Sequence, residues 1–257
     1  MTIRELYEKL DELYPRSLSC EWDNDGLMFC PDPDRAVTRV MLALDATRGA
    51  IEAAAREKCE LLLTHHPMLF RPLRSLTPLD LSGSRVMDAW NSGVSVISLH
   101  TRLDAGKNGV NDALANRLGL AVCGTFGDEE SPELGRMAEL TEPMDPRAFA
   151  EQVRRALGCD AVHLTGDHPV RRIAMVGGDG KDFIRPAMKA GADTFITGAA
   201  GYNMALDAAE EGLNILEAGH YHTEAPVLDR LAELCRDLAG AQCFFFDSNL
   251  TRTVVGR

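Results

Sequence analysis

Histidines and carboxylates occur together at several places in this sequence, in patterns typical of metal ligands. A His-His-Pro triplet occupies 65–67, and two further histidines are each followed four residues later by a carboxylate. Imidazole nitrogens and carboxylate oxygens without thiolates suit Zn²⁺, Fe²⁺ or Mn²⁺, and the sequence does not choose among these ions. The candidate metal ligands are His65, His66, Asp104, His220 and Glu224.

The adjacent pair His65 and His66 favours two ions over one. Neighbouring residues on a strand point to opposite faces, so both would rarely bind a single ion. Two ions about 3.5–4 Å apart could each take one imidazole, and either Asp104 or Glu224 could bridge them. A single histidine at the end of a strand is more often a hydrogen-bonded packing residue. The metal interpretation therefore requires that the candidate ligands, which are far apart in the sequence, lie close together in the fold.

Three apolar runs of strand length come shortly before these histidines. They are Leu61–Thr64 before His65, Val94–Leu99 before His100, and Leu213–Leu216 three residues short of His220. Ligands of open α/β sheets bind at the carboxyl ends of the strands. If the sheet is parallel, the three ends lie on one rim, and we expect the metal site there.

Helical patterns alternate with strand candidates along most of the chain, which predicts βαβ units. The strand candidates are apolar throughout, so both faces of the sheets should be covered. The other strands are expected at Val40–Leu44, Ile173–Val176 and Thr194–Thr197. Helices are expected at Thr2–Leu13, Arg48–Lys58, Arg85–Asn91, Val110–Leu118, Pro146–Leu157, Asp182–Ala190, Tyr202–Glu211 and Glu224–Leu238. The fold class is therefore α/β, with largely parallel sheets flanked by helices.

The segment Gly124–Pro146 differs from the rest because it is rich in Gly, Pro and acidic residues. We interpret it as a lobe boundary with an exposed loop. A second βαβ series follows and runs to about Glu211, so two α/β lobes are compatible with the pattern.

Two short motifs allow two interpretations each. Residues 177–180, Gly-Gly-Asp-Gly, could bind an anion through backbone amides, or could form a turn that needs a positive φ. Residues 21–26, Glu-Trp-Asp-Asn-Asp-Gly, could cover the mouth of a site, or could be a turn around a buried Trp22.

Three of the seven histidines lie outside the ligand pattern. His163 and His168 fall in a polar, hairpin-like segment, and we expect both at the surface. His222 could line the site or face solvent.

Composition places the chain among globular proteins of ordinary type. Its 257 residues are 45% hydrophobic and 26% charged, enough to bury a sizeable core. No apolar run reaches the roughly 18 residues needed to span a bilayer, and the N-terminus is no secretory signal, so we expect a cytoplasmic protein without membrane contact. A net charge of −12 argues against a nucleic acid polymer but does not exclude a nucleotide.

Seven cysteines are present, and no two have the spacing of a metal knuckle or a redox motif. In the cytoplasm we expect buried free thiols instead of disulfides.

Longer stretches of the sequence resemble a known family. They are EWDNDGL, LLLTHHPMLF, SLHTRLDAGKNGVNDALANRLGL and GADTFITGAAGYNMALDAAEEGLNILEAGHYHTE. Together they are similar to the GTP cyclohydrolase 1 type 2 homologue family, proteins with a dinuclear metal centre that assemble as toroidal hexamers. The resemblance covers most of the chain.

The resemblance implies a role for each candidate ligand. His65 and Asp104 would hold one ion, His66 and His220 the other, and Glu224 would bridge them. Two further residues of the same motif, His100 and Thr101, would lie in the second shell or the pocket wall.

The resemblance also implies an organisation and an assembly. A metal-binding lobe would comprise 1–124 and 213–257, with 125–212 as an inserted second α/β lobe. The chain would form a toroidal homohexamer.

One departure from the family affects the expected chemistry. Relatives often carry an acid and a histidine in the stretch that reads TGAAGYNMALD here, at the positions of Ala199 and Asn203. If those residues face the metals in relatives, this chain keeps the ligands and lacks a pair for proton transfer.

The leading expectation is a metal-dependent hydrolase that acts on a small, nucleotide-like substrate. Side-chain ligands alone leave open coordination positions for water or substrate. The alternative is a metal-binding, metal-delivery or regulatory protein without turnover. A diiron redox site is less attractive, because no cofactor motif or paired thiol accompanies the ligands.

Overall fold

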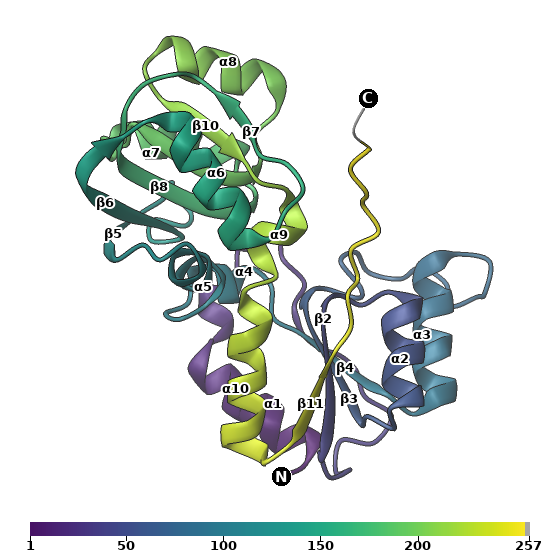
Figure 1. Ribbon diagram of the computed structural model, residues 1–257. Coiled ribbons are helices and arrows are strands. Elements are labelled where there is room, and N and C mark those ends of the chain that lie inside the picture. The colour runs from purple at the N-terminus through teal and green to yellow at the C-terminus, as the bar shows by residue number, and fades with distance from the viewer. Residues whose placement is uncertain (255–257) are drawn as a thin grey trace. The chain divides into compact units, whose positions relative to one another are not determined.

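The computed structural model describes residues 1–254 and divides the chain into two compact units. Unit 1 contains residues 1–103 and 228–250. Unit 2 contains residues 104–227 and, of the C-terminal segment, 251–254. Each unit has one β-sheet with helices packed against it (Figure 1).

Unit 1 is built on a five-stranded sheet in the order β1-β4-β3-β2-β11. Its strands are β1 (Gly26–Phe29), β2 (Arg39–Asp45), β3 (Leu61–His66), β4 (Ser95–Ser98) and β11 (Gln242–Phe245). The last four run parallel, and β1 is antiparallel to β4. The carboxyl ends of β2, β3 and β4 therefore meet at one edge of this sheet.

Helices cover both faces of the unit 1 sheet (Figure 1). They are α1 (Ile3–Leu13), α2 (Arg48–Arg56), α3 (Leu81–Ser92) and α10 (Val227–Ala239). A capping box between Thr2 and Glu5 starts α1. Small apolar residues of α2 and α3, among them Ala54 and Ala89, pack on alternate residues of β2, β3 and β4. Burial of these apolar side chains stabilises the packing of α2 and α3 on the sheet. This packing holds the edge at which β2, β3 and β4 end.

Unit 2 is built on a six-stranded sheet in the order β5-β6-β8-β9-β10-β7. Its strands are β5 (Val122–Phe126), β6 (Gly135–Met144), β7 (His163–Thr165), β8 (Val170–Asp179), β9 (Thr194–Ala199) and β10 (Asn214–Glu217). The central strands β8, β9 and β10 are parallel, and the strands outside them pair antiparallel. The carboxyl ends of the three parallel strands again share one edge.

Alternate residues of these strands face two separate cores. Ile173, Met175 and Ile196 pack against α5 and α6, whereas Ala174 and Phe195 pack against α7 and α8. The helical segments of unit 2 are α4 (Thr101–Ala105, which begins at the end of unit 1), α5 (Val110–Arg117), α6 (Pro146–Leu157), η2 (Lys181–Phe183), α7 (Ile184–Lys189), α8 (Tyr202–Glu210) and α9 (His220–Glu224).

The structure confirms the predicted fold class, an α/β chain with two sheets flanked by helices. Each of the six predicted strands is present, and α6 has the predicted bounds. The segment 124–146 contains an exposed loop, as predicted, at 127–134. This loop is not a lobe boundary, because it joins β5 and β6, which form an antiparallel pair inside unit 2. No described helix is long and apolar enough to cross a membrane.

The boundaries between the two units differ from those expected from the sequence. The predicted inserted lobe was 125–212, whereas unit 2 begins at 104 and continues to 227. The difference arises because β10 pairs with β9, and because α5 and α9 pack on the strands of unit 2.

Candidate metal centre

His65 and His66 end β3, and each has its Nδ1 atom fixed by an oxygen. Nδ1 of His65 lies 2.9 Å from the carbonyl oxygen of Leu99, and the side chain is fully buried. Nδ1 of His66 lies 2.8 Å from Oδ1 of Asp45, the last residue of the neighbouring strand β2. The two rings lie 4.8 Å apart between centroids.

His100 joins this pair from the end of β4. Its Nδ1 lies 2.8 Å from Oδ1 of Asp23, and its ring centroid lies 5.2 Å from that of His65. Thr101 donates to the same carboxylate through its backbone N–H and its hydroxyl, at 3.0 and 2.6 Å. Burial would raise the pKa of Asp23, but the hydrogen bonds from His100 and Thr101 outweigh it and lower the pKa to about 2. Asp23 is therefore an ionised acceptor at neutral pH.

These contacts fix which nitrogen of each ring is available to an ion. A carbonyl oxygen or an ionised carboxylate can only accept, so Nδ1 carries the proton in each neutral ring and Nε2 carries the lone pair. Metal-binding histidines commonly show this arrangement. In His65, His66 and His100, one potential ligand atom from each residue lies within 4.8 Å of the others. The donor set of unit 1 therefore fits a divalent ion that prefers nitrogen.

A network of buried acids, not predicted from the sequence, holds His100 in place. Asp25 accepts from the backbone N–H of His100 at 3.1 Å and from Nε of Arg102 at 3.0 Å. Asp23, Asp25 and Arg102 are nearly or fully buried. The motif at 21–26 therefore supplies the carboxylates that orient His100 and the start of α4.

Trp22 is not the buried centre of a turn, because 57% of its surface is exposed. Its ring lies 6.1 Å from His100 and 6.0 Å from Phe70 in edge-to-face arrangements. Of the two interpretations of this motif, the structure favours an aromatic residue packed beside the histidine cluster.

In unit 2, helix α9 carries the other predicted histidine and carboxylate. Nε2 of His220 lies 3.1 Å from Oε2 of Glu224, one turn apart on α9. Glu224 is 4% exposed, whereas the side chain of His220 is 48% exposed. An imidazole and a buried carboxylate at this distance are suitable ligands for the same class of ions.

Glycines make room for α9 against the sheet. A Cβ on Gly178 would lie 2.2 Å from Oε1 of Glu224, and one on Gly198 would lie 2.6 Å from Cα of His220. Gly178 also has a φ of +69°, at an irregularity near the end of β8. The Gly-Gly-Asp-Gly motif is thus explained by a positive φ and by close approach to Glu224.

The remaining candidates lie on or near short helices. Asp104 is half-buried on α4, and its backbone carbonyl accepts from Nδ2 of Asn111 at 3.2 Å. Thr101 is buried against Asp23, and His222 is half-buried on α9. His163 and His168 are exposed, as predicted.

The two departures from the family pattern are surface residues. Ala199 ends β9 and Asn203 lies in the first turn of α8, and both are exposed. Neither side chain titrates near neutral pH.

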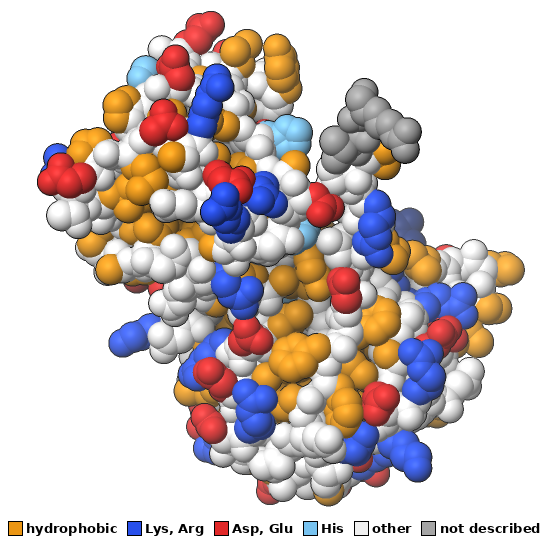
Figure 2. Space-filling model, in the orientation of Figure 1, with side chains coloured by type: hydrophobic (Ala, Val, Ile, Leu, Met, Phe, Trp, Pro, Cys, Tyr) orange, Lys and Arg blue, Asp and Glu red, His pale blue; other side chains and the backbone are white. Residues whose placement is uncertain are grey.

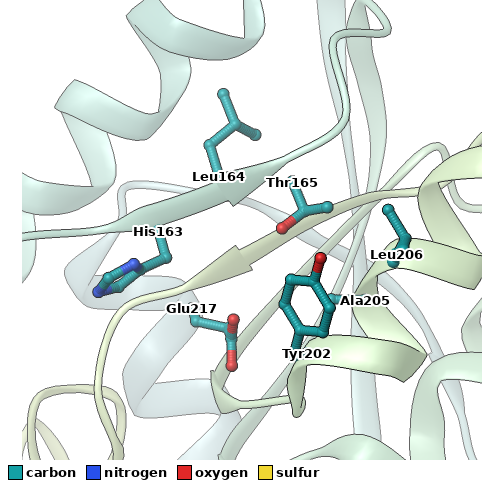
Figure 3. Close-up of a pocket in the computed structure, with 7 residues that line it drawn as sticks. All are labelled: His163, Leu164, Thr165, Tyr202, Ala205, Leu206 and Glu217. Carbon is teal, nitrogen blue, oxygen red and sulfur yellow. The ribbon is translucent and has the colours of Figure 1, made fainter.

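A pocket of about 280 Å³ lies in unit 2 between β7, β10 and α8 (Figure 3). Its carboxylate, Glu217, accepts from the backbone N–H of Ala200 at 2.8 Å, which orients the side chain. Glu217 ends β10 and precedes His220 by three residues. The lining residues are His163, Leu164, Thr165, Tyr202, Ala205, Leu206 and Glu217. The sequence analysis did not predict this pocket.

Comparisons with known proteins agree over nearly the whole chain. A family model described as Duf34/NIF3 (NGG1p interacting factor 3) matches residues 1–250. A GTP cyclohydrolase 1 type 2 homolog of Clostridium perfringens is 34% identical over 243 residues, which cover 92% of each chain. The crystal structure of Staphylococcus aureus protein SA1388 aligns with a TM-score of 0.88 and 25% identity over 99% of both chains. Reduced HcgD from Methanocaldococcus jannaschii aligns with a TM-score of 0.82 and 25% identity over 95% of this chain and 97% of its own.

Proposed function

Because the chain belongs to the Duf34/NIF3 family, we propose that it binds two divalent metal ions and uses them to hydrolyse a small, nucleotide-like substrate. His65 and Asp104 would hold one ion and His66 and His220 the other, with Glu224 as the bridge. The ions would be Zn²⁺, Fe²⁺ or Mn²⁺.

One observation carries the proposal: every histidine at the sheet edge of unit 1 has its Nδ1 fixed by an oxygen. Leu99, Asp45 and Asp23 supply these oxygens. A histidine that only packs in a core has no need for its Nε2 atom to be oriented together with the Nε2 atoms of two neighbouring histidines. The rings of His65, His66 and His100 share one tautomer, and their potential ligand atoms lie within 4.8 Å of one another, which favours an ion over packing. His65 and His66 would be the ligands, and His100 would lie beside them.

The residues of the chain would prepare the site in distinct ways. Asp45 would increase the basicity of His66, and the Asp23 network would keep His100 beside the ligands. Gly178 lets Glu224 approach the sheet while it remains buried. When bound, the ions would supply a Lewis acid and an ionised water near neutral pH.

The pocket of unit 2 offers room for the organic part of a substrate. Tyr202 and Glu217 both line this pocket (Figure 3). An aromatic face and a carboxylate suit a planar ring with N–H donors, such as a nucleobase. The position of Glu217 three residues before His220 supports this assignment.

The alternative is a metal-binding, metal-delivery or regulatory protein without turnover. Ala199 and Asn203 favour it, because neither can transfer a proton where relatives often carry an acid and a histidine. Under this alternative the ligands are the same and only the chemistry differs.

The proposal includes a toroidal homohexamer, which rests on the family resemblance, and a cytoplasmic location, which rests on the sequence pattern. It includes no nucleic acid polymer as a partner. A net charge of −12 supports that exclusion, as does the mixing of Lys and Arg with Asp and Glu on the face that Figure 2 shows.

A substrate panel at measured metal content tests the proposal. The protein is loaded separately with Zn²⁺, Mn²⁺ and Fe²⁺ and incubated with nucleotides and simple phosphoesters. We expect metal-dependent hydrolysis that is lost in His66→Ala and kept in His168→Ala, an exposed histidine outside the site. Full metal occupancy without turnover on any substrate would favour the non-catalytic alternative.

A further inference from the structure

Two cysteines of unit 1 lie close together where α10 connects to β11. Cys235 is fully buried on α10, and Cys243 is half-buried on β11. Sγ of Cys243 lies 3.7 Å from the carbonyl oxygen of Ala241, in the turn between the two elements. Sγ of Cys243 also lies 3.6 Å from the carbonyl oxygen of Ala232, which precedes Cys235 by about one turn on the same side of α10. The sulfur of Cys243 is therefore directed at the helix surface that carries Cys235.

The backbone holds this pair in place. The N–H of Ala241 donates to the carbonyl of Cys235 at 3.3 Å, and Gly240 turns the chain with a φ of +63°. Strand β11 then pairs in parallel with β2, with Cys243 opposite Val40. Phe244 packs against the core beneath α2 and α3, so its neighbour Cys243 faces the side of α10. The position of Cys243 beside α10 thus follows from the pairing of the strand.

The two thiols differ in character. The hydrogen bond from Cys235, with a contribution from the Arg236 guanidinium, outweighs burial and lowers the pKa of Cys243 to about 7. The same hydrogen bond and full burial raise the pKa of Cys235 well above its ordinary value. Burial also raises the pKa of Cys59 to about 11. Cys243 therefore has the thiolate character and partial access of an attacking thiol, and Cys235 the position of a resolving one.

We propose that Cys235 and Cys243 form a thiol–disulfide exchange site that reacts with low-molecular-weight disulfides. The thiolate of Cys243 attacks one sulfur of the small disulfide, which breaks its S–S bond and releases one small thiolate. Cys235 then loses its proton to that thiolate and attacks Sγ of Cys243, which releases the second small thiolate. Two protein thiols are oxidised to one disulfide, and the small disulfide is reduced to two thiols.

The disulfide would link α10 covalently to β11. The chain that follows β11 contacts Asp45, the carboxylate that orients His66. Three residues beyond the strand, the hydroxyl of Ser248 donates to Oδ2 of Asp45 at 2.8 Å. Oδ1 of the same carboxylate holds His66. Oxidation therefore acts on the segment that orients a candidate metal ligand.

The test uses the full chain in its native state with oxidised glutathione as the probe. The parent protein and both variants carry Cys123→Ser, because Cys123 is exposed and would react on its own, and the unmodified chain is the control for reactivity. We expect the parent protein to lose about 2 Da and two thiols, with the disulfide mapped by peptide mass spectrometry to Cys235 and Cys243. Cys235→Ser should stop at a mixed disulfide between glutathione and Cys243. Cys243→Ser should form neither product.

If a variant folds poorly, the product that the parent protein forms with oxidised glutathione is sufficient to test the proposal. Two outcomes would overturn the proposal: a stable mixed disulfide at Cys243 that Cys235 never resolves, or both thiols unchanged while Cys123 of the unmodified chain reacts completely. A disulfide that joins Cys243 to any other cysteine would also contradict it.

Discussion

Asp45 and His66 are opposite each other at the carboxyl ends of two adjacent parallel strands, with Oδ1 of Asp45 2.8 Å from Nδ1 of His66. Ser248 completes the arrangement, because its hydroxyl donates to Oδ2 of Asp45. The carboxylate is thereby fixed at both oxygens and holds the imidazole in one orientation. A change at Asp45 should therefore alter metal affinity without removing a ligand.

We expect Asp45→Asn to weaken metal binding about 10–100-fold, the range found when the carboxylate behind a ligating histidine is changed. The amide can still accept from His66, so the fold should be kept. Titration against a competing chelator measures the affinity. The matched control is Asp88→Asn, which removes an ion pair with Arg48 elsewhere in unit 1. Equal affinities of the two variants would contradict the role of Asp45.

Much of the fold could be predicted because the central strands are apolar on both faces. Apolar runs such as Val40–Leu44 and Leu61–Thr64 are readily distinguished from the helix between them. The resemblance to the family is also confirmed. The antiparallel strands β1, β5, β6 and β7 and the outer parallel strand β11 were not predicted, because none of them is a continuous run of buried apolar residues. Glu224 was placed at the start of a helix, whereas it ends α9.

The candidate histidines could be predicted from their positions after apolar runs, but their supports could not. Asp45 is one acid among many in the sequence, and only strand register places it beside His66. Asp23 and His100 are 77 residues apart and meet only through the tertiary fold. Asp23 and Asp25 belong to the motif at 21–26, which the sequence analysis singled out without assigning these acids a partner.

We expect Gly178→Ala to cost more stability than Gly158→Ala and to weaken metal binding. Both glycines have nearly the same positive φ, +69° and +66°, so the backbone strain of about 1–2 kcal/mol should be common to both. A Cβ at 178 would lie 2.2 Å from Oε1 of Glu224, whereas one at 158 meets nothing within 4 Å. Urea unfolding and chelator competition measure the two effects. If both variants behave alike, Gly178 does not position Glu224.

The low pKa of Asp23 predicts a loss of stability in acid. Hydrogen bonds from His100 and Thr101 lower the folded pKa to about 2 from an ordinary value near 3.8. The stabilisation is therefore complete above about pH 4 and is lost as the pH falls towards 2, and it amounts to about 2 kcal/mol. Urea unfolding of the metal-free protein between pH 5 and 3 measures about half of it, because the folded pKa lies below this range. Asp23→Asn should be less stable at pH 5 and should lack this part of the pH dependence, and an unchanged dependence would contradict the prediction.

Restoring the family residues at the surface of unit 2 should raise turnover. Positioned acid–base groups contribute about 10²–10⁴-fold to rate, so Ala199→Asp with Asn203→His should accelerate hydrolysis without changing metal content. Both positions are exposed, so the fold should tolerate the change. Single-turnover hydrolysis of GTP and simple phosphoesters at matched metal occupancy measures the effect. If the unmodified protein is already fast, or the double variant is metal-replete and no faster, these positions do not transfer protons.

Metal content per chain tests the central claim most directly. The purified protein is stripped with a chelator, reloaded separately with Zn²⁺, Mn²⁺ and Fe²⁺, freed of excess ion and measured by elemental analysis. We expect two ions per chain, and in His66→Ala the loss of most of one ion with weaker binding of the other. A wild-type protein that retains no transition metal after reloading with any of the three ions would contradict the account.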